Sequence, residues 1–567
     1  MNKIAGLALA VFLLAAPFAS ARADDGVGQT VLSPEDLRAY QNIFAAEKAG
    51  QLVKSDALAA KLEDKSLIGY VLAERYLGPH HHSQFEELKA WLAKYEDLAS
   101  ADRIYDLAKK RTPKKTFVPA PRPPHWRGAI GDGDAFEDVD LESPLARRAA
   151  ERMKTFVHNG KPEGAHALLK TLSAKSALPP ADVDRLTAYV AAAYFFDVND
   201  EAALTLSEGA LQHGGAAVAK LRWTAGLAAY RLGQFERAAR HFEALTQAGQ
   251  SAARTFSAAS FWAARSWMRA GSPERVMTLY QHAAAEPQTF YGLLAARLLG
   301  RDIGADFAEP ALDTVSFAAL MRNGAAHRAV ALWQIGHTDM VEAELAHAFG
   351  EIDPDLDAAF AALARHLGAP ALELRAAELL SERDVQLTSL YPIPPYQPKG
   401  GYAIDRAVVL AFARQESRFQ PSALSRVGAR GVMQIMPTTA ADITHDSSLA
   451  KRNKVRLDDP VYSMTLGQDY LRDLLDRQNG NLFGLAAAYN AGAGNLSKWM
   501  SLHEGMNDPL LFIESLPPAE TRDYIKRVMM NMWMYRKRLG QPADGLDDAA
   551  SGAWPVYTQS GADSAAH

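Results

Sequence analysis

The sequence predicts an all-α protein in which a helical superhelix precedes a compact C-terminal domain. Three observations carry this prediction. Alanine- and leucine-rich helical segments fill most of residues 24–385, aromatic residues recur within them at nearly constant spacing, and composition changes after a proline-rich joint at 390–401. The 567 residues allow several domains, and a hydrophobic content of 48% is enough to build their cores.

The N-terminus has the organisation of a secretory signal peptide over residues 1–23. Lys3 gives a positive start, residues 4–16 are apolar, and Ala21 to Ala23 form a small-x-small cleavage site. The apolar part is too short to span a bilayer stably, and no later segment approaches the length that a spanning helix needs. We therefore expect export to the periplasm without stable membrane insertion.

Composition excludes several other classes of protein. The chain contains no cysteine, which excludes disulfides, thiol catalysis, cysteine-rich zinc sites and a lipid anchor on an N-terminal cysteine. The formal net charge of −5 does not suggest a nucleic-acid-binding protein, whose usual mark is a strongly basic face. No nucleotide motif is visible, and adjacent histidines at 80–82 do not converge on one ion from a regular helix, so we expect no metal and no cofactor.

Residues 24–111 are predicted to form an N-terminal helical domain. Ser33 with Asp36, and Ser83 with Glu86, have the spacing of a capping hydroxyl followed by a carboxylate three residues on. Residues 112–140 follow as a connector with five prolines between Pro113 and Pro124. Proline removes backbone donors and fixes φ, so this segment is extended rather than helical.

Residues 141–385 are predicted to form a superhelix of helix pairs resembling tetratricopeptide repeats. Tyr194, Tyr230 and Trp267 each precede a short turn and another helix, at spacings of 36 and 37 residues. Such pairs stack because one pair cannot bury its own apolar face. Residues 386–545 then form the separate compact domain, and the weakly patterned tail, 546–567, is predicted to be disordered.

One stretch of the compact domain, "ARQESRFQPSALSRVGARGVMQIMPTTA", contains a carboxylate in an unusual place. On a helix beginning near residue 404, Val409, Phe412 and Ala413 share a face with Glu416. Apolar neighbours disfavour the charged carboxylate and raise its pKa, which is the property of a general acid. The alternative is a structural glutamate that caps a turn or pairs with Arg414 or Arg418.

Polar residues downstream favour the interpretation of Glu416 as a general acid over that of a structural glutamate. Gln434 is the only polar side chain in "VMQIMP" and needs hydrogen-bond partners, for which a ligand would serve. Tyr489 and Asn490 end a small-residue helix before glycines, as in surfaces that bind sugar rings and N-acetyl groups. Glu520 lies in the first turn of a helix, where a carboxylate is also stabilising for structural reasons alone.

These motifs, in this order, resemble the catalytic domain of the soluble lytic murein transglycosylases. The resemblance rests on "ES" followed by a serine nine residues on, "GVMQIMP", "AYNAG" and "ETRDYIKRV". It covers roughly residues 400–540, and "FYGLLAARLLG" at 290–300 resembles a segment near the end of the superhelical domain in this family. It implies a goose-type-lysozyme-like, mainly α catalytic domain. In large periplasmic members the helical domains form a ring; whether this chain closes one stays open.

The resemblance also implies roles for individual residues. Glu416 matches the single catalytic glutamate, which protonates the glycosidic oxygen and then acts as base. The substrate-binding positions implied are Ser425, Gln434, Met436, Tyr489, Asn490 and Glu520. Val432 stands where leucine is common in the motif, a mild apolar change.

The partner implied is the glycan strand of peptidoglycan, cleaved between N-acetylmuramic acid and N-acetylglucosamine with formation of 1,6-anhydro ends. We expect exo-action in cell-wall turnover. A single carboxylate is sufficient if the sugar's own hydroxyl is the nucleophile, whereas ordinary glycosidases need a second one.

Two alternatives remain. A hydrolytic muramidase needs a second acid, for which Asp442, Asp446, Asp458 or Asp459 is available. A non-enzymatic scaffold that binds murein or partner enzymes needs no acid. Partner proteins, oligomeric state and preferred glycan length are not indicated by the sequence.

Overall fold

The computed structural model describes residues 30–113, 116–125, 127, 141–213, 219–247, 252–302 and 307–559. The predicted signal peptide lies outside the described residues, as do residues 128–140 of the connector. Within these ranges the protein is helical and has isolated β-bridges but no strand. The prediction of an all-α fold is confirmed.

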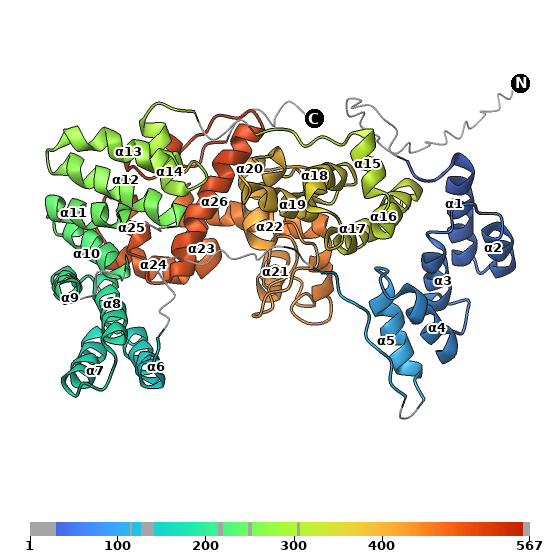
Figure 1. Cartoon of the computed structure of the whole chain (residues 1–567), viewed down its shortest axis with the longest axis horizontal. Helices are drawn as coiled ribbons and strands as arrows, with labels where there is room; N and C mark the ends of the chain where they lie inside the picture. Colours follow the sequence, from blue (N-terminus) through green and yellow to red (C-terminus); the bar gives the residue numbers. More distant parts are fainter. Residues whose placement is uncertain are drawn as a thin grey trace, which may run out of the picture.

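One group of helices combines the N-terminal region with a later part of the chain, and Figure 1 shows it at the end of the molecule that carries α1. The helices before the connector are α1 (Pro34–Lys48), α2 (Leu52–Ala59), α3 (Ile68–Leu77), α4 (Phe85–Tyr95) and α5 (Ala101–Arg111). Those after it are α15 (Thr314–Leu320), α16 (Gly324–Ile335), α17 (Val341–Phe349), α18 (Asp357–His366) and α19 (Pro370–Ser381).

A shared hydrophobic core holds this first group together. At the junction Glu344 of α17 is fully buried and accepts hydrogen bonds from the Tyr70 hydroxyl of α3 and from Nε of Arg328 at 2.8 Å. A buried carboxylate needs such partners, so this cluster also fixes the two parts of the chain to each other.

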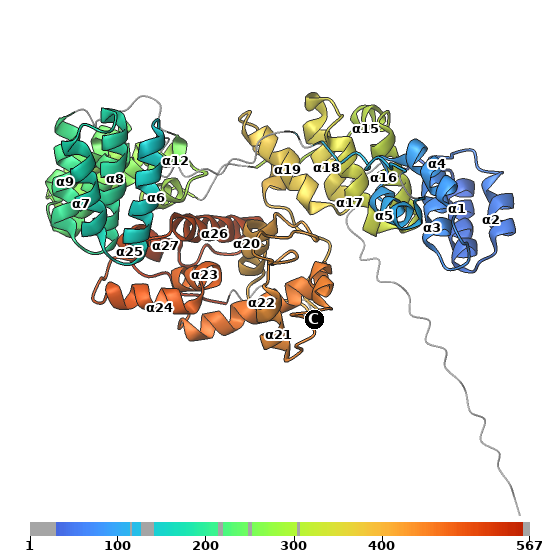
Figure 2. The same cartoon turned by 90° about the horizontal axis from the view of Figure 1, so that it is seen from below.

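A second group forms the opposite end of the molecule (Figure 2). It comprises α6 (Pro144–His158), α7 (Pro162–Ala174), α8 (Pro180–Phe196), α9 (Asp200–Gln212), α10 (Ala219–Arg231), α11 (Phe235–Thr246), α12 (Ala253–Arg269), α13 (Val276–Ala284) and α14 (Phe290–Leu298). Successive helices pack on one another. Tyr194, Tyr230 and Trp267 end the first helix of successive pairs and are buried, as the repeat spacing predicts.

The predicted superhelix over 141–385 is therefore divided between two cores. Helices α6–α14 share a core with the C-terminal domain, whereas α15–α18 share one with α1–α5, and α19 contributes residues to both cores. The predicted boundaries grouped α15–α19 with the repeats because both are alanine-rich helices. Composition carries no information about which apolar faces meet, so this regrouping required the tertiary structure.

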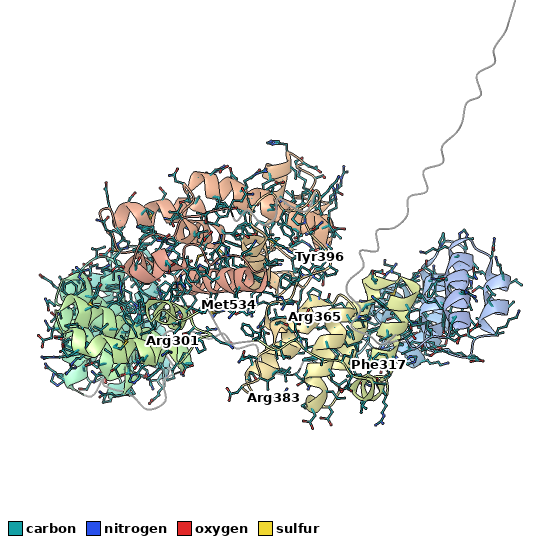
Figure 3. All side chains as sticks on the ribbon, turned by 90° about the horizontal axis from the view of Figure 1, so that it is seen from above. Arg301, Phe317, Arg365, Arg383, Tyr396 and Met534 are labelled. Atoms are coloured by element: carbon teal, nitrogen blue, oxygen red, sulfur yellow. The ribbon has the colours of Figure 1, made fainter. Side chains whose placement is uncertain are left out.

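The C-terminal domain lies between the two groups in Figures 1 and 2. Its helices are α20 (Arg406–Ser417), α21 (Pro437–Thr444), α22 (Pro460–Arg477), α23 (Leu482–Ala491), α24 (Ala493–Leu502), α25 (Pro509–Glu514), α26 (Ala519–Arg538) and α27 (Leu546–Ser551). In Figure 3, Met534 marks α26 and Arg365 marks the neighbouring α15–α19 helices. None of the helices in the described residues is both long and apolar enough to cross a bilayer.

Two local predictions need correction. Ser83 does not cap α4: the cap is Gln84, whose backbone N–H donates to Glu87 Oε2 at 2.6 Å, while the Ser83 hydroxyl donates to the Tyr76 carbonyl at 2.7 Å. Ser33 does cap α1, accepting from the Asp36 N–H at 3.1 Å. The Ser83 hydroxyl is buried against the end of α3, so it bonds there instead.

The tail after Gly545 is ordered as far as the described residues extend, to 559. Leu546 and Ala549 of α27 are buried, and Trp554 packs on Phe512 with ring centroids 5.3 Å apart. The Tyr557 N–H donates to the Gly480 carbonyl at 2.7 Å. Single anchoring residues hold this segment, and single residues produce no periodic pattern in a sequence.

Candidate active site

Helix α20 carries Glu416 in its last turn, and both ends of this helix are fixed by tertiary contacts. At its start, the Asp405 side chain accepts from the Ala407 N–H at 2.9 Å. The same carboxylate forms a fully buried ion pair with Arg536 of α26 at 2.7 Å. At its end, Arg418 adopts a left-handed conformation with φ of 53°, which terminates the helix. The direction of the Glu416 side chain is thereby set by α20 and α26 together.

Glu416 lies on the buried stripe of α20, as predicted. Val409, Phe412 and Ala413 on this face are completely buried. The residue keeps some exposure through a cleft of about 610 Å³, whose walls come from α20, α23, α26 and the 425–436 segment. Glu416 does not pair with Arg414 or Arg418, which was the structural alternative. Both arginines are oriented toward Glu378 of α19.

The electrostatic environment of Glu416 suits a proton donor. The pKa of Glu416 is raised to about 8: burial is the largest cause, the Tyr524 hydroxyl that donates to Oε1 opposes it, and the charge of Glu520 adds to it. The net direction is that of a carboxyl that holds its proton at neutral pH. Tyr524 is itself buried, and burial holds the pKa of its phenol well above the usual range, so it remains a hydrogen-bond donor.

The loop after α20 places Ser425 and Gln434 on the cleft wall. The Ser425 hydroxyl oxygen accepts from the Ala429 N–H at 2.9 Å, which leaves its own hydrogen for a further acceptor. Gln434 has a left-handed backbone with φ of 45°, and its Nε2 donates to the carbonyls of Ala423 and Gly431, each at 2.9 Å. The prediction that a ligand supplies the partners of Gln434 therefore needs correction for the amide nitrogen, which is bound by backbone.

The residues predicted on α23 and α26 also reach the cleft. Tyr489 donates its hydroxyl to the Met433 carbonyl at 2.7 Å and packs on Phe412 with ring centroids 4.9 Å apart. Asn490 connects the two helices: its Oδ1 accepts from the Thr521 hydroxyl at 2.7 Å, and its Nδ2 donates to Glu520 at 3.3 Å. These bonds hold an amide and a carboxylate at the cleft surface in fixed orientations.

The structure thus brings all the predicted site residues to one cleft. They are Glu416, Ser425, Gln434, Met436, Tyr489, Asn490 and Glu520. The cleft is completed by residues that sequence reasoning missed, including Gln415, Asp523, Tyr524 and Arg527. Tyr524 could have been found, because it follows Glu520 by four residues and therefore lies on the same face of α26.

The aspartates considered as a second acid do not line this cleft. Asp458 is paired with Arg430 at 2.6 Å, Asp459 caps α22 by accepting from the Tyr462 N–H at 2.7 Å, and Asp446 accepts from the Ser448 N–H at 3.0 Å. Asp442 lies on α21 outside the cleft lining. The carboxylates that share the cleft with Glu416 are instead Glu520 and Asp523 of α26.

A second cavity of about 660 Å³ adjoins the cleft at Glu416, Gln434 and Arg527; we call it the rear cavity. Helix α12 contributes Arg254 to its wall, and α19 contributes Arg375 and Glu378. Residues of both helical groups therefore line the same cavity as Glu416. The cleft itself is lined by the C-terminal domain, and the helical groups contribute to the adjoining rear cavity.

In a comparison with known protein families, residues 396–510 match the family described as the transglycosylase SLT domain. Over 150 residues the chain is 36% identical to a soluble lytic murein transglycosylase of Salmonella typhimurium, covering 26% of this chain and 23% of that protein. Over 141 residues it is 37% identical to the soluble lytic murein transglycosylase of Escherichia coli K12, covering 25% and 22%. The matched region spans less than a quarter of the length of these relatives.

The fold of the whole chain is also similar to a solved structure. An inactive variant of the lytic transglycosylase Slt from Pseudomonas aeruginosa superposes with a TM-score of 0.55 over 89% of this chain and 74% of that one, at 22% identity. At this identity the likeness establishes the arrangement of helices alone. The region that carries Glu416 therefore matches the transglycosylase SLT domain and is similar in sequence to soluble lytic murein transglycosylases.

Proposed function

We propose that the protein is a lytic transglycosylase that cleaves the β-1,4 bond between N-acetylmuramic acid and N-acetylglucosamine in peptidoglycan. The observation that carries this proposal is Glu416: a carboxyl in an open cleft whose burial raises its pKa to about 8. A donor of this kind is protonated at neutral pH and can give its proton to a leaving glycosidic oxygen. The family relation of residues 396–510 supports the same substrate.

The proposed reaction has two steps. Glu416 first donates its proton to the glycosidic oxygen, the bond to C1 of the muramyl residue breaks, and the N-acetylglucosamine leaves as an alcohol. The muramyl C6 hydroxyl then attacks C1, and its proton passes to the Glu416 carboxylate. The products are a 1,6-anhydro ring and the protonated enzyme, so no water is consumed and the acid is regenerated.

Other groups in the cleft support this sequence of steps. The Tyr524 hydroxyl bonds to Glu416 and stabilises the carboxylate that forms after the first proton transfer. Ser425 has a hydroxyl hydrogen to offer to the glycan, and Asn490 and Glu520 present polar atoms at the cleft surface. These side chains hold and orient the sugar, so that the intramolecular attack has the advantage of proximity.

The decisive experiment pairs product analysis with Glu416→Gln. Purified murein digested by the unaltered protein should give anhydromuramyl ends by mass spectrometry, and Glu416→Gln should lower turnover by about 10²–10⁴-fold. Circular dichroism should match that of the unaltered protein. Release of muropeptides by the variant at a near-normal rate would refute the assignment of the acid.

The hydrolytic alternative retains one structural argument, because Glu520 and Asp523 share the cleft with Glu416 and a muramidase needs a second carboxylate. It predicts reducing ends in place of anhydro ends. The same mass spectra therefore separate the two reactions.

We further propose that the enzyme works in the periplasm during cell-wall turnover and acts from glycan ends. The signal-peptide pattern of residues 1–23 supports the location. Residues of both helical groups line the rear cavity beside Glu416, which supports action at an end, because a strand that continued through this cavity would meet them. Release of disaccharide-sized products from the start of digestion is expected; early release of long fragments would contradict it.

A further inference from the structure

A short segment near the C-terminus, residues 555–558, contacts all three helices that carry the main cleft side chains; we call it the clasp. The helices are α20, α23 and α26, and α26 packs on both of the others (Figure 2). The clasp lies beyond residues 396–510, which match the SLT domain, and belongs to the tail for which the sequence pattern predicts disorder. None of its residues lines the cleft, so any effect on the site is indirect.

The clasp binds the start of α23 through the backbone. The Leu482 N–H donates to the Pro555 carbonyl at 3.0 Å, and the Tyr557 N–H donates to the Gly480 carbonyl at 2.7 Å. Leu482 is the first residue of α23, and an N–H in this position has no partner inside its own helix. Tyr489, at the other end of α23, lines the cleft.

The clasp also binds α26 near its C-terminal end. Nη2 of Arg536 donates to the Thr558 carbonyl at 3.2 Å. Arg536 is completely buried, and the same guanidinium pairs with Asp405 at 2.7 Å. Tyr524, whose hydroxyl donates to Glu416, lies in the first half of α26.

The third contact is with the start of α20. The Asp405 N–H donates to the Tyr557 hydroxyl at 3.0 Å. Asp405 is the N-cap residue of α20 and is 2% exposed, so this N–H has little access to water. Glu416 lies in the last turn of the same helix, about 16 Å away at a rise of 1.5 Å per residue. A displacement of Asp405 along α20 therefore displaces Glu416, because the hydrogen-bonded helix between them is stiff.

In each of the three helices, the clasp binds the end that is remote from the cleft. It binds the first residues of α20 and α23 and the last turn of α26, whereas the cleft residues lie at the opposite ends of these helices. Three helices joined at one point keep fixed positions relative to one another. The hydrogen bond between Tyr524 and Glu416 connects two of the ends that meet at the cleft, so its geometry depends on this joint.

We infer that residues 555–558 set the relative position of the three cleft helices, and that Tyr557 is a positioning residue for Glu416, acting through the cap of α20. The inference rests on the proposed function for its kinetic test, in which Glu416 is the acid. A merely structural contact and a positioning contact differ in their consequences. Loss of the first lowers stability alone, whereas loss of the second also changes the bond between Tyr524 and Glu416.

Tyr557→Phe keeps the ring and removes the acceptor of the Asp405 N–H. A buried donor without a partner is costly, so the turn before α20 should shift and move Glu416 relative to Tyr524. A longer bond from the Tyr524 hydroxyl stabilises the carboxylate less. The alkaline limb of kcat/KM should therefore move upward by about half a pH unit, less than in Tyr524→Phe, which removes this bond altogether. We expect kcat to fall about three- to tenfold with KM nearly unchanged, because misalignment affects the reacting groups more than binding.

A double variant separates positioning from general destabilisation. If Tyr557 acts on Glu416 through the Tyr524 hydrogen bond, adding Tyr557→Phe to Tyr524→Phe should leave the alkaline limb where Tyr524→Phe alone puts it. Shifts of the limb that add would show that the two tyrosines act independently and would overturn the inference. An unmoved limb in Tyr557→Phe alone would overturn it as well.

The matched control is Tyr535→Phe. Tyr535 is also a phenol of this domain, and its hydroxyl donates to the Pro392 carbonyl at 3.1 Å, a bond that does not involve α20. Tyr535 is completely buried, so thermal unfolding should show at least as large a loss of stability as in Tyr557→Phe. The alkaline limb should nevertheless stay in place. Equal shifts in the two variants would contradict the role assigned to the clasp.

A titration without turnover keeps this test distinct from that of the proposed function. Carboxyl NMR of the full chain with isotope-labelled glutamate follows the ionisation of Glu416, whose signal is identified by its loss in Glu416→Gln. The midpoint should rise in Tyr557→Phe and stay unchanged in Tyr535→Phe. If the unaltered protein fails to digest murein, the proposed function fails and the midpoints still decide the positioning role. If digestion succeeds and the midpoint is the same in all three proteins, the positioning role alone is refuted.

Discussion

Replacing Tyr524 by phenylalanine tests how the structure tunes its proposed acid. The Tyr524 phenol donates a hydrogen bond to Glu416 and lowers the pKa of that carboxyl. Its ring packs on Phe412 of α20. Phenylalanine keeps the ring and removes the donor. The carboxylate therefore loses a stabilising partner, and the pKa of Glu416 should rise above its value of about 8.

The size of this rise can be worked from the contact. A hydrogen bond to a charged group contributes about 1.5–3 kcal/mol, and one pKa unit corresponds to about 1.4 kcal/mol. Because Glu416 keeps some exposure to the cleft, solvent replaces part of the lost bond, and we expect the lower end, a rise of about one unit. A general acid works in its protonated form, so the alkaline limb of kcat/KM should move upward in pH by this amount.

The assay is the pH dependence of murein solubilisation at constant ionic strength. The control is Tyr470→Phe, which removes a phenol from a ring that packs on Tyr489 at 5.3 Å between centroids but does not line the cleft. Its profile should match that of the unaltered protein. A limb that stays in place or moves downward in Tyr524→Phe would refute the reasoning that this hydroxyl stabilises the ionised Glu416.

Three further predictions follow from the same contacts. Glu416→Gln should stabilise the fold at pH 8 by about 1–3 kcal/mol and much less at pH 5, measured by denaturant unfolding. A carboxyl whose pKa is raised in the folded state contributes stability that is full below its unfolded pKa and is lost as pH rises through its folded pKa, and glutamine has no charge to bury at either pH. An equal effect at both pH values would contradict this linkage. Glu378→Gln removes the negative charge that Arg418 and Arg414 share, which should lower the pKa of Glu416. The alkaline limb of kcat/KM should therefore move downward by less than about one pH unit, opposite in sign to Tyr524→Phe. Glu382→Gln is the comparison, because Glu382 also lines the rear cavity. Asp405→Asn breaks the buried pair with Arg536 and should cost about 3–5 kcal/mol of unfolding free energy, whereas the exposed Asp473→Asn, paired with Arg477, should cost less than about 1 kcal/mol; similar costs for both would refute the role assigned to burial.

Much of the candidate site could be predicted before any coordinates. The period of α20 puts Glu416 on the same face as Val409 and Phe412, and a face is a local property that the 3.6-residue repeat determines. The motifs that surround Gln434, Tyr489 and Glu520 identified the other cleft residues, and each of them lines the cleft. The helices of the superhelix and the spacing of their repeats could be predicted for the same reason, because both are local properties of the sequence.

Tertiary structure alone decided the contacts between segments far apart in the chain. Arg414 and Arg418 were predicted as possible partners of Glu416 because they are its neighbours in the sequence. In the structure both arginines face Glu378, and Glu416 accepts a hydrogen bond from Tyr524, 108 residues away. The tertiary structure also packs α15–α18 in one core with α1–α5 and anchors the tail through Trp554 and Tyr557. Periodicity fixes which side of a helix is apolar, but the partner of that side depends on how distant surfaces fit together, and no local pattern encodes this fit.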